Sequence, residues 1–239
     1  MISLLKKKKP DVLDDVITYT IDDLRKEKHN NNLKSNLKIL NKSEVSVLII
    51  DDNGYDIEPL KQLGYRDVEI SYDFEEMIKL KKYNIIFCDI NEVASKIYPT
   101  GQGAQLASKI KKEYPEKMVI IFSAQSQKLS FSKYYNSVDK VIDKLADYET
   151  ISEIIDEYIE TQNDPIKYWE AMKKQMLKQN ISTLQIAKME HYYVKSFLQK
   201  NNCLKEYISC ISSNELSTIL SFAQIIISSI DLFLKIIGK

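Results

Sequence analysis

Three acidic residues stand directly after apolar, β-branched runs. Asp51 and Asp52 follow residues 45–50, and Asp89 follows residues 84–88. Such runs are typical of strands buried on both faces of a parallel sheet, and ligands of these sheets bind at the carboxyl ends of the strands. We therefore expect the three carboxylates to lie at one rim and to need a cation. Mg²⁺, a hard ion that prefers oxygen ligands, suits them.

Two further side chains at this rim suit acyl-phosphate chemistry. Ser123 ends the run from residue 118, and Lys144 follows residues 140–143. Asp89 can act as the nucleophile that accepts a phosphoryl group, while a metal offsets charge. The Lys144 ammonium can bind the acceptor carboxylate and then the phosphate as a point charge. The Ser123 hydroxyl can hydrogen-bond a phosphate oxygen.

Short apolar runs alternate with helical patterns through the middle of the chain. Expected strands cover residues 45–50, 68–71, 84–89, 118–123 and 140–143, and expected helices cover residues 73–82, 104–114, 129–136 and 148–159. Alternation of this kind predicts an α/β fold, a doubly wound five-stranded parallel sheet. Lys140 begins the last expected strand, so we place Lys144, which lies beyond the end of that strand, at the rim instead.

The motifs at the rim resemble those of the receiver domains of response regulators in two-component signalling. They are Leu-Ile-Ile-Asp-Asp at 48–52, Ile-Phe-Cys-Asp-Ile at 86–90, Ile-Ile-Phe-Ser-Ala at 120–124 and Asp-Lys-Val-Ile-Asp-Lys at 139–144. The resemblance implies a flavodoxin-like receiver with Asp89 as phospho-acceptor, and with Asp51, Asp52 and Asp89 as the Mg²⁺ site. Ser123 and Lys144 would then be the phosphate-binding and switch residues.

The same resemblance implies partners and the extent of catalysis. We expect a histidine kinase or another phosphodonor protein to act on this phosphoprotein within a phosphorelay. We expect no enzymatic activity beyond slow self-dephosphorylation. The chain contains no Gly-x-Ser-x-Gly elbow or phosphate-cradling glycine loop that would indicate a hydrolase.

Four features differ from the usual receiver pattern and leave an alternative open. They are a short segment with Pro59 after the first strand, a long loop with Pro99, Gly101 and Gly103 after Asp89, Val141 at a position that is commonly aromatic, and Leu145 in place of a proline. The alternative is a phosphate-independent pseudo-receiver that serves as a scaffold.

Charge and composition predict three segments. Residues 1–43, an extension with an expected helix at 11–24 and a loop or linker at 30–32, contain 10 Lys and Arg against 6 Asp and Glu. Residues 44–160, the receiver, contain 14 against 22, and residues 161–239, an all-α C-terminal module, contain 10 against 6. Asn163-Asp-Pro stops one helix and starts the next.

The C-terminal module reads as helix over residues 165–179, 182–200, 203–212 and 214–237. Residues 216–234 are apolar on nearly all sides, so this helix is expected to be buried. It could pack in the module, form a homo-oligomer interface or insert in a membrane, and Asp231 weakens the last reading. In the alternative function, this helix drives oligomerisation or membrane association.

Other features of the sequence bear on partners and compartment. The region 182–188 lacks the turn glycine and basic recognition helix of a DNA-binding motif, so we expect no nucleic acid partner. Cys88, Cys203 and Cys210 suggest free thiols, and no signal peptide is evident. We therefore expect a cytoplasmic protein, with membrane association only through the C-terminal helix.

Overall fold

The computed structural model describes residues 18–30, 37–74, 76–122, 131–211 and 213–238, and of residues 213–218 only the backbone. Within this part, a five-stranded sheet consists of β1 (Ser46–Ile50), β2 (Asp67–Ser71), β3 (Ile85–Cys88), β4 (Met118–Phe122) and β5 (Lys140–Ile142). All neighbouring strands are parallel, in the order β2-β1-β3-β4-β5. This is the flavodoxin-like doubly wound order, so the predicted fold class is confirmed.

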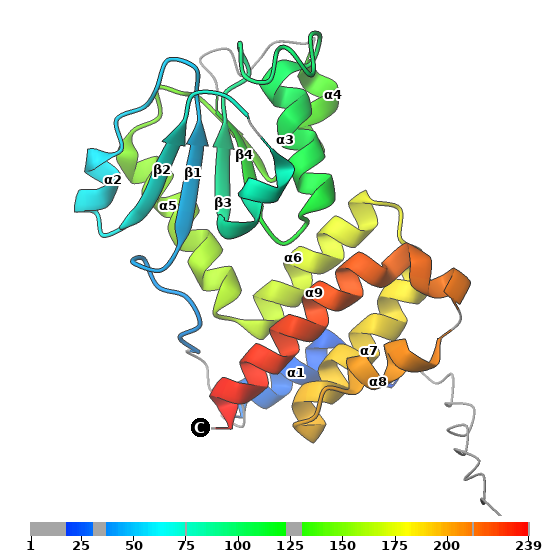
Figure 1. The fold of residues 1–239 in the computed structure, drawn as a ribbon. Helices are drawn as coiled ribbons and strands as arrows, with labels where there is room; N and C mark the ends of the chain where they lie inside the picture. Colours follow the sequence, from blue (N-terminus) through cyan, green and yellow to red (C-terminus); the bar gives the residue numbers. More distant parts are fainter. Residues whose placement is uncertain (1–17, 31–36, 75, 123–130, 212, 239) are drawn as a thin grey trace, which may run out of the picture.

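Helices cover both faces of this sheet (Figure 1). One face packs against the 3-10 helix η1 (Met77–Lys82) and α3 (Gln102–Glu113), with α4 (Ser132–Tyr135) beside α3. The other face packs against α2 (Glu58–Gln62) and α5 (Tyr148–Gln162). The strands are buried on both sides, which explains their continuous apolar runs.

Two expected helices are shorter in the structure. The helix expected over residues 73–82 is reduced to η1, in which only Leu80 is buried, so little packing energy supports a longer element. The helix expected over residues 129–136 is α4, the four residues from Ser132 to Tyr135; residues 129 and 130 lie outside the described residues. The segment with Pro59 forms α2, a single short helix with the proline in its first turn.

A helical module makes up the other half of the molecule. It contains α6 (Pro165–Lys178), α7 (Thr183–Gln199), α8 (Cys203–Cys210) and α9 (Ser213–Ile237). The N-terminal helix α1 (Ile21–His29) adds Ile21 and Leu24 to the same hydrophobic core. The receiver-like domain is therefore inserted in the chain between α1 and α6, two helices of one core.

The position of α1 corrects the expected helix at 11–24. Residues 1–17 lie outside the described residues, and the helix begins at Ile21 and continues to His29, beyond the expected end at residue 24. The Asp23 carboxylate accepts a hydrogen bond from the backbone nitrogen of Thr20, which defines the start. Lys26, Lys28 and His29 occupy the last turn, where positive charge offsets the helix dipole.

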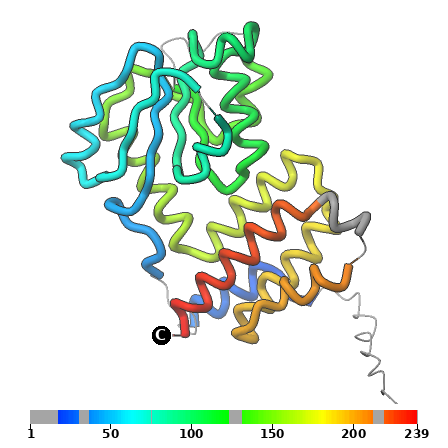
Figure 2. The backbone as a smooth tube through the Cα atoms, in the orientation of Figure 1, coloured from blue at the N-terminus to red at the C-terminus, as the bar shows by residue number. Residues whose placement is uncertain are grey.

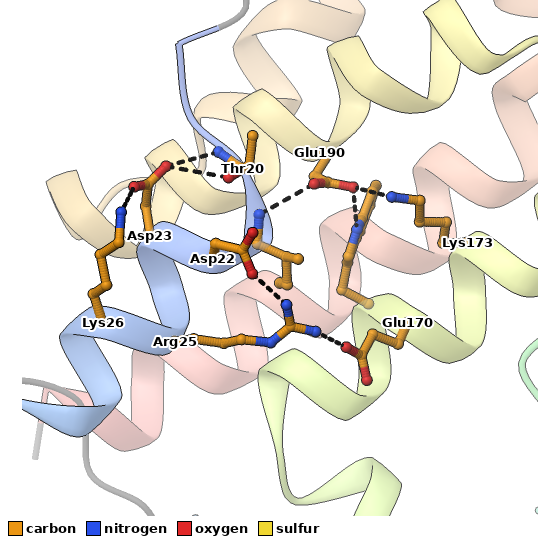
Figure 3. Close-up of polar contacts among 10 residues, drawn as sticks. Thr20, Asp22, Asp23, Arg25, Lys26, Glu170, Lys173 and Glu190 are labelled. Atoms are coloured by element: carbon orange, nitrogen blue, oxygen red, sulfur yellow. Dashed lines mark hydrogen bonds and ion pairs between the residues drawn. The ribbon is translucent and has the colours of Figure 1, made fainter.

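Two neighbouring residues of α7 hold the beginning of α1. Figure 3 shows the buried Glu190 carboxylate between α1 and α6. It accepts hydrogen bonds from Ile21 N of α1 (3.1 Å) and from Trp169 Nε1 (2.9 Å) and Lys173 Nζ (2.8 Å) of α6. The next side chain, His191, accepts hydrogen bonds from the backbone nitrogens of Thr18 and Tyr19 at its Nδ1, both at 3.2 Å. The start of α1 is thus held by a carboxylate and an imidazole.

The chain crosses between the two modules twice, at one place (Figure 2). The Asn163 side chain accepts from Ile39 N and Leu40 N and donates to Leu40 O, each at 2.8 Å. Its amide thereby binds the outgoing segment much as a neighbouring strand would. Beside it, Lys28 Nζ lies 2.6 Å from Asp164 Oδ2 at the start of α6.

The helical module docks at the edge of the sheet where the strands begin (Figure 1). Asp139, directly before β5, is the centre of this contact. Its Oδ2 lies 2.8 Å from Lys111 Nζ at the end of α3, and its Oδ1 accepts from Gln175 Nε2 of α6 at 3.0 Å. Lys178 Nζ donates to Val138 O at 2.9 Å.

Helix α9 lies in this module with one apolar face buried. Among the described residues, its segment Ile219–Ile237 is long and apolar enough to span a membrane, and 39% of that window is buried in the protein. Ile226, Ile230 and Phe233 belong to the helical core. An apolar composition combined with such packing is weak evidence for a membrane helix.

Candidate metal and phosphorylation site

Asp51 and Asp89 lie beside each other because their strands are paired in register. Ile50 of β1 is opposite Cys88 of β3, so the residue after each reaches the same rim. Asp51 is fully buried, Asp89 is 3% exposed, and Asp52 is half-buried. One carboxylate oxygen from each of the three lies within 4.8 Å of the others. The structure thus brings the three expected acids together.

Lys144 completes this cluster from the turn after β5. Its Nζ lies 2.6 Å from Asp51 Oδ2 and 3.0 Å from Asp89 Oδ2. Burial alone would lower the pKa of Lys144, but hydrogen bonds to Asp51 and Asp89 outweigh it and raise that pKa above its ordinary value. Lys140, at the opposite end of β5, pairs with Glu157 Oε2 at 2.7 Å instead.

The residues present fit a divalent cation. Three carboxylates face one ammonium, which leaves an excess of negative charge if all are ionised. Among the buried side-chain atoms of the described residues, one has no hydrogen-bond partner of good geometry, and that atom is Asp51 Oδ2. It is nevertheless ion-paired with Lys144. A buried carboxylate oxygen beside two further acids is a donor set that hard divalent ions prefer.

Backbone and amide groups orient the acids. Asp51 Oδ1 accepts from Asn53 N at 3.0 Å, and Asp89 Oδ1 accepts from Ile90 N at 2.7 Å. The Asn53 side chain donates to Asp52 Oδ1 at 2.9 Å. Sequence reasoning missed Asn53; an asparagine directly after two strand-end acids is the signal for such a turn.

The long loop after Asp89 is folded onto the site. A Cβ at Gly103 would lie 1.7 Å from the backbone oxygen of Asp89, so only glycine allows this approach. Gly103 N donates to Ile90 O at 3.0 Å, and Ala94 N donates to Asp73 Oδ1 at 2.8 Å. The loop is therefore attached at both ends to the rim, and the sequence showed its length but not this packing.

Three non-glycine residues here have left-handed backbone conformations: Glu92 (φ 60°) and Ala94 (φ 54°) in the loop, and Gln102 (φ 42°), the first residue of α3. Each conformation of this kind costs roughly 1–3 kcal/mol and persists only where surrounding contacts impose it. Gln102 Oε1 accepts from Glu92 N at 3.2 Å, which links two of the three. The concentration of strain next to Asp89 points to a functional constraint on the loop.

The remaining predicted positions are placed as follows. Ser123 lies outside the described residues, so its role stays a prediction. Val141 is half-buried on β5, and Leu145 is 87% exposed directly beside Lys144. Cys88 is buried, donates from Sγ to Gly103 O at 3.3 Å, and has its thiol pKa raised by burial, as expected of a packing residue rather than a reactive thiol.

No protein-family model and no curated protein matches this chain. Among solved structures, the chain is similar to a response regulator from Burkholderia pseudomallei with a phosphorylated aspartic acid, calcium ion and citrate, at 20% identity and a TM-score of 0.37 over 60% of this chain and 91% of that one. It is also similar to NtrX from Brucella abortus in complex with ATP, at 15% identity and a TM-score of 0.39 over 64% of this chain. To NtrX from Brucella abortus in complex with ADP, the chain is similar at 16% identity and a TM-score of 0.38 over 63% of this chain. This chain spans about a third of the NtrX chains, 34% and 33%.

The strand order and the residues at the rim define the class of this domain. A parallel sheet in the order β2-β1-β3-β4-β5, with Asp51, Asp89 and Lys144 meeting at its carboxyl edge, is a receiver-like domain. A helical C-terminal part accompanies it, as expected.

Proposed function

We propose that this protein is a response regulator-like signalling protein, switched by phosphorylation of Asp89. The observation that carries the proposal is the Lys144 ammonium, which contacts Asp51 and Asp89 at 2.6 Å and 3.0 Å. A structural ion pair needs one carboxylate, whereas here two buried acids share one cation and the half-buried Asp52 lies beside them. Such crowding is costly in a buried site and is expected where the acids have a chemical role.

The chemistry assigned to these residues is a phosphoryl transfer. Asp89 Oδ2 attacks the phosphorus of a donor, the bond from phosphorus to the donor's leaving group breaks, and an acyl phosphate forms. Lys144 then binds a phosphoryl oxygen in place of the carboxylate oxygen it contacts now. Mg²⁺, held by Asp51, Asp52 and Asp89, would offset the charge on the transferred group. Slow self-dephosphorylation is the one catalytic activity we propose: water attacks the phosphorus, the bond to the Asp89 oxygen breaks, and inorganic phosphate leaves the restored carboxylate.

We propose a histidine kinase or another phosphodonor protein as the partner, and the helical module as the output element, in the cytoplasm. The alternative is a phosphate-independent scaffold whose C-terminal helix drives oligomerisation or membrane association. This alternative depends on α9, and one apolar face of α9 already packs in the helical core. No observation therefore favours the scaffold over a protein switched by phosphorylation.

The test is the intact mass of the protein after incubation with acetyl phosphate and Mg²⁺. Wild type should gain one phosphoryl group, and Asp89→Asn should gain none. Asp67→Asn, at the opposite edge of the sheet, is the matched control and should behave as wild type. The proposal is wrong if folded wild type gains no phosphoryl group and a beryllofluoride phosphomimic with Mg²⁺ also leaves its Tm unchanged.

A further inference from the structure

A second polar site lies where the receiver-like domain meets the helical module, away from the rim that carries Asp89. A cavity of about 500 Å³ opens between α3, α4 and the end of α6. Among the described residues, its lining includes Lys111, Lys112, Lys133 and Lys178, and the others are serines, asparagines and glutamines. Within this part of the chain, neither a carboxylate nor an apolar side chain lines the cavity.

The charges of these lysines are poorly compensated. Lys112 and Lys133 are exposed, and among the described residues no carboxylate lies within ion-pair distance of Lys112, Lys133 or Lys178. Lys178 Nζ donates to Val138 O, a neutral carbonyl. Burial lowers the pKa of Lys178, the neighbouring Lys174 lowers it further, and Asp139 opposes this in part.

Asp139 compensates the positive charge of the cavity only in part, because its oxygens face other groups. One oxygen faces Lys111 Nζ at 2.8 Å and also accepts from Val119 N at 2.8 Å, and the other accepts from Gln175 Nε2. It therefore balances Lys111, the one buried lysine of the four. Three ammonium groups remain, surrounded by hydroxyl and amide groups.

We infer that this cavity binds a small polyphosphorylated anion. Ammonium groups are point-charge partners for phosphate, and hydroxyl and amide donors satisfy further phosphate oxygens. The volume suits a small ligand, because binding cavities are commonly about 300–1,000 Å³. The absence of aromatic and apolar lining argues against a nucleobase, which such cavities hold by stacking, and favours a polyphosphate or a phosphorylated sugar or polyol.

The ligand would contact both modules at once. Lys112 and Lys133 belong to the receiver-like domain and Lys178 to the helical module, so an anion between them stabilises the docked arrangement by mass action. A purely structural explanation exists, because α3, α4 and α6 all end here and lysines in the last turn offset the helix dipole. If the lysines serve only the helix dipoles, an added anion does not bind specifically in the cavity. Anion binding therefore distinguishes the two explanations.

The experiment is calorimetric titration of the full chain with inorganic tripolyphosphate in EDTA, so that the candidate metal site does not participate. Wild type should show saturable binding of one ion per chain, weakened by added NaCl. The double variant Lys112→Gln/Lys133→Gln should bind at least about tenfold more weakly, since it loses two charge-assisted contacts. Both lysines are exposed, and circular dichroism should show that the variant folds.

The matched control is Lys109→Gln/Lys205→Gln, which removes the same charge from exposed lysines outside the cavity and should bind as wild type. Asp89→Asn should also bind as wild type, and ATP should bind no more tightly than tripolyphosphate. Absence of saturable binding, equal weakening by the two double variants, or loss of binding in Asp89→Asn would each overturn the inference. None of these results bears on whether Asp89 accepts a phosphoryl group.

Discussion

At the scale of single residues, Lys144 holds together acids that would otherwise repel each other. It is 20% exposed in its side chain, whereas Asp51 and Asp89 are at 0% and 4%. The same ammonium serves both carboxylates, so its removal leaves two buried charges without a counter-ion. Removing one partner of a buried pair is costly because the other charge stays desolvated.

We therefore expect Lys144→Met to lower the free energy of unfolding by roughly 2–4 kcal/mol in the absence of metal. Addition of Mg²⁺ should restore part of this loss, because a divalent ion can take over the role of the ammonium. Urea unfolding with EDTA and with Mg²⁺ measures both effects.

The control for this measurement is Lys140→Met, which removes a more exposed ion pair between β5 and Glu157 of α5. Its cost should be about 0–1 kcal/mol and should not respond to Mg²⁺. Equal losses in the two variants, or a Lys144→Met protein indifferent to Mg²⁺, would show that Lys144 is not the counter-ion of a metal site.

The acids of the candidate site could be predicted from sequence because each one follows an apolar strand. A strand position fixes which end of the sheet a residue reaches, so Asp51, Asp89 and Lys144 could be placed together without coordinates. Gly103 could not, because its requirement arises from contact with Asp89 O across a folded loop. Residues whose roles depend on tertiary packing leave no periodic signal.

At the scale of elements, α1 is attached to the helical module by polar groups as well as by the buried Ile21 and Leu24. Glu190 accepts a hydrogen bond from Ile21 N. Burial would raise the pKa of this carboxyl, but hydrogen bonds from Lys173, Ile21 N and Trp169 outweigh burial, so the pKa is lowered. Arg25 lies between Asp22 of α1 and Glu170 of α6 (Figure 3). The helix is thus oriented by charges that belong to α6 and α7.

The imidazole of His191 makes this attachment sensitive to pH. Its Nδ1 must be unprotonated to accept from Thr18 N and Tyr19 N, and the pKa of His191 is lowered, first by burial and then by Lys195. Tyr19 stacks on the ring, and Glu190 precedes it on α7. A lowered folded-state pKa means that this stability is present above the ordinary histidine value of about 6.5 and is lost as pH falls below it.

We expect the urea midpoint to fall between neutral pH and about pH 5 more steeply in wild type than in His191→Asn. Asparagine can present its Oδ1 to the same donors without titrating in this range. His29→Asn, at the exposed end of α1, should keep the wild-type slope. Identical slopes for wild type and His191→Asn would contradict this account of the imidazole.

Element types were largely predictable, and lengths less so. The β-branched runs identified the strands, and Ser182 and Gln185 marked the start of α7, where the Ser182 side chain accepts from Gln185 N. The helix expected to end at residue 24 continues to His29, supported by packing on α6 and α7. The polar, lysine-containing composition of residues 25–29 gave no sign of this continuation, which tertiary contacts stabilise.

At the scale of the whole molecule, Asp139 joins the two modules directly before the strand that leads to Lys144. Lys111, 4% exposed, depends on this carboxylate, since burial lowers the pKa of Lys111 and Asp139 counteracts that effect. The pair therefore stabilises both the receiver-like domain and its contact with Gln175 of α6.

Asp139→Asn should lower the free energy of unfolding by roughly 2–4 kcal/mol, because it leaves the Lys111 charge buried without a counter-charge. Asp143→Asn, an exposed acid four residues further on, should cost less than about 1 kcal/mol. Denaturant titration compares the two. A small, equal effect in both variants would mean that Lys111 is satisfied by its bonds to Pro115 O and Lys117 O alone.

The insertion of the receiver-like domain between α1 and α6 has a consequence for biosynthesis. Residues that hold α1, such as Glu190 and His191, come 169 to 173 positions later in the chain. As the ribosome releases the chain, the parallel sheet and its helices can fold once α5 has emerged. At that stage α1 still lacks α6 and α7, the helices against which it packs. Among the described helices, the first to be synthesised is therefore among the last to pack, and its apolar residues Ile21 and Leu24 must stay unaggregated until α6 and α7 have been synthesised.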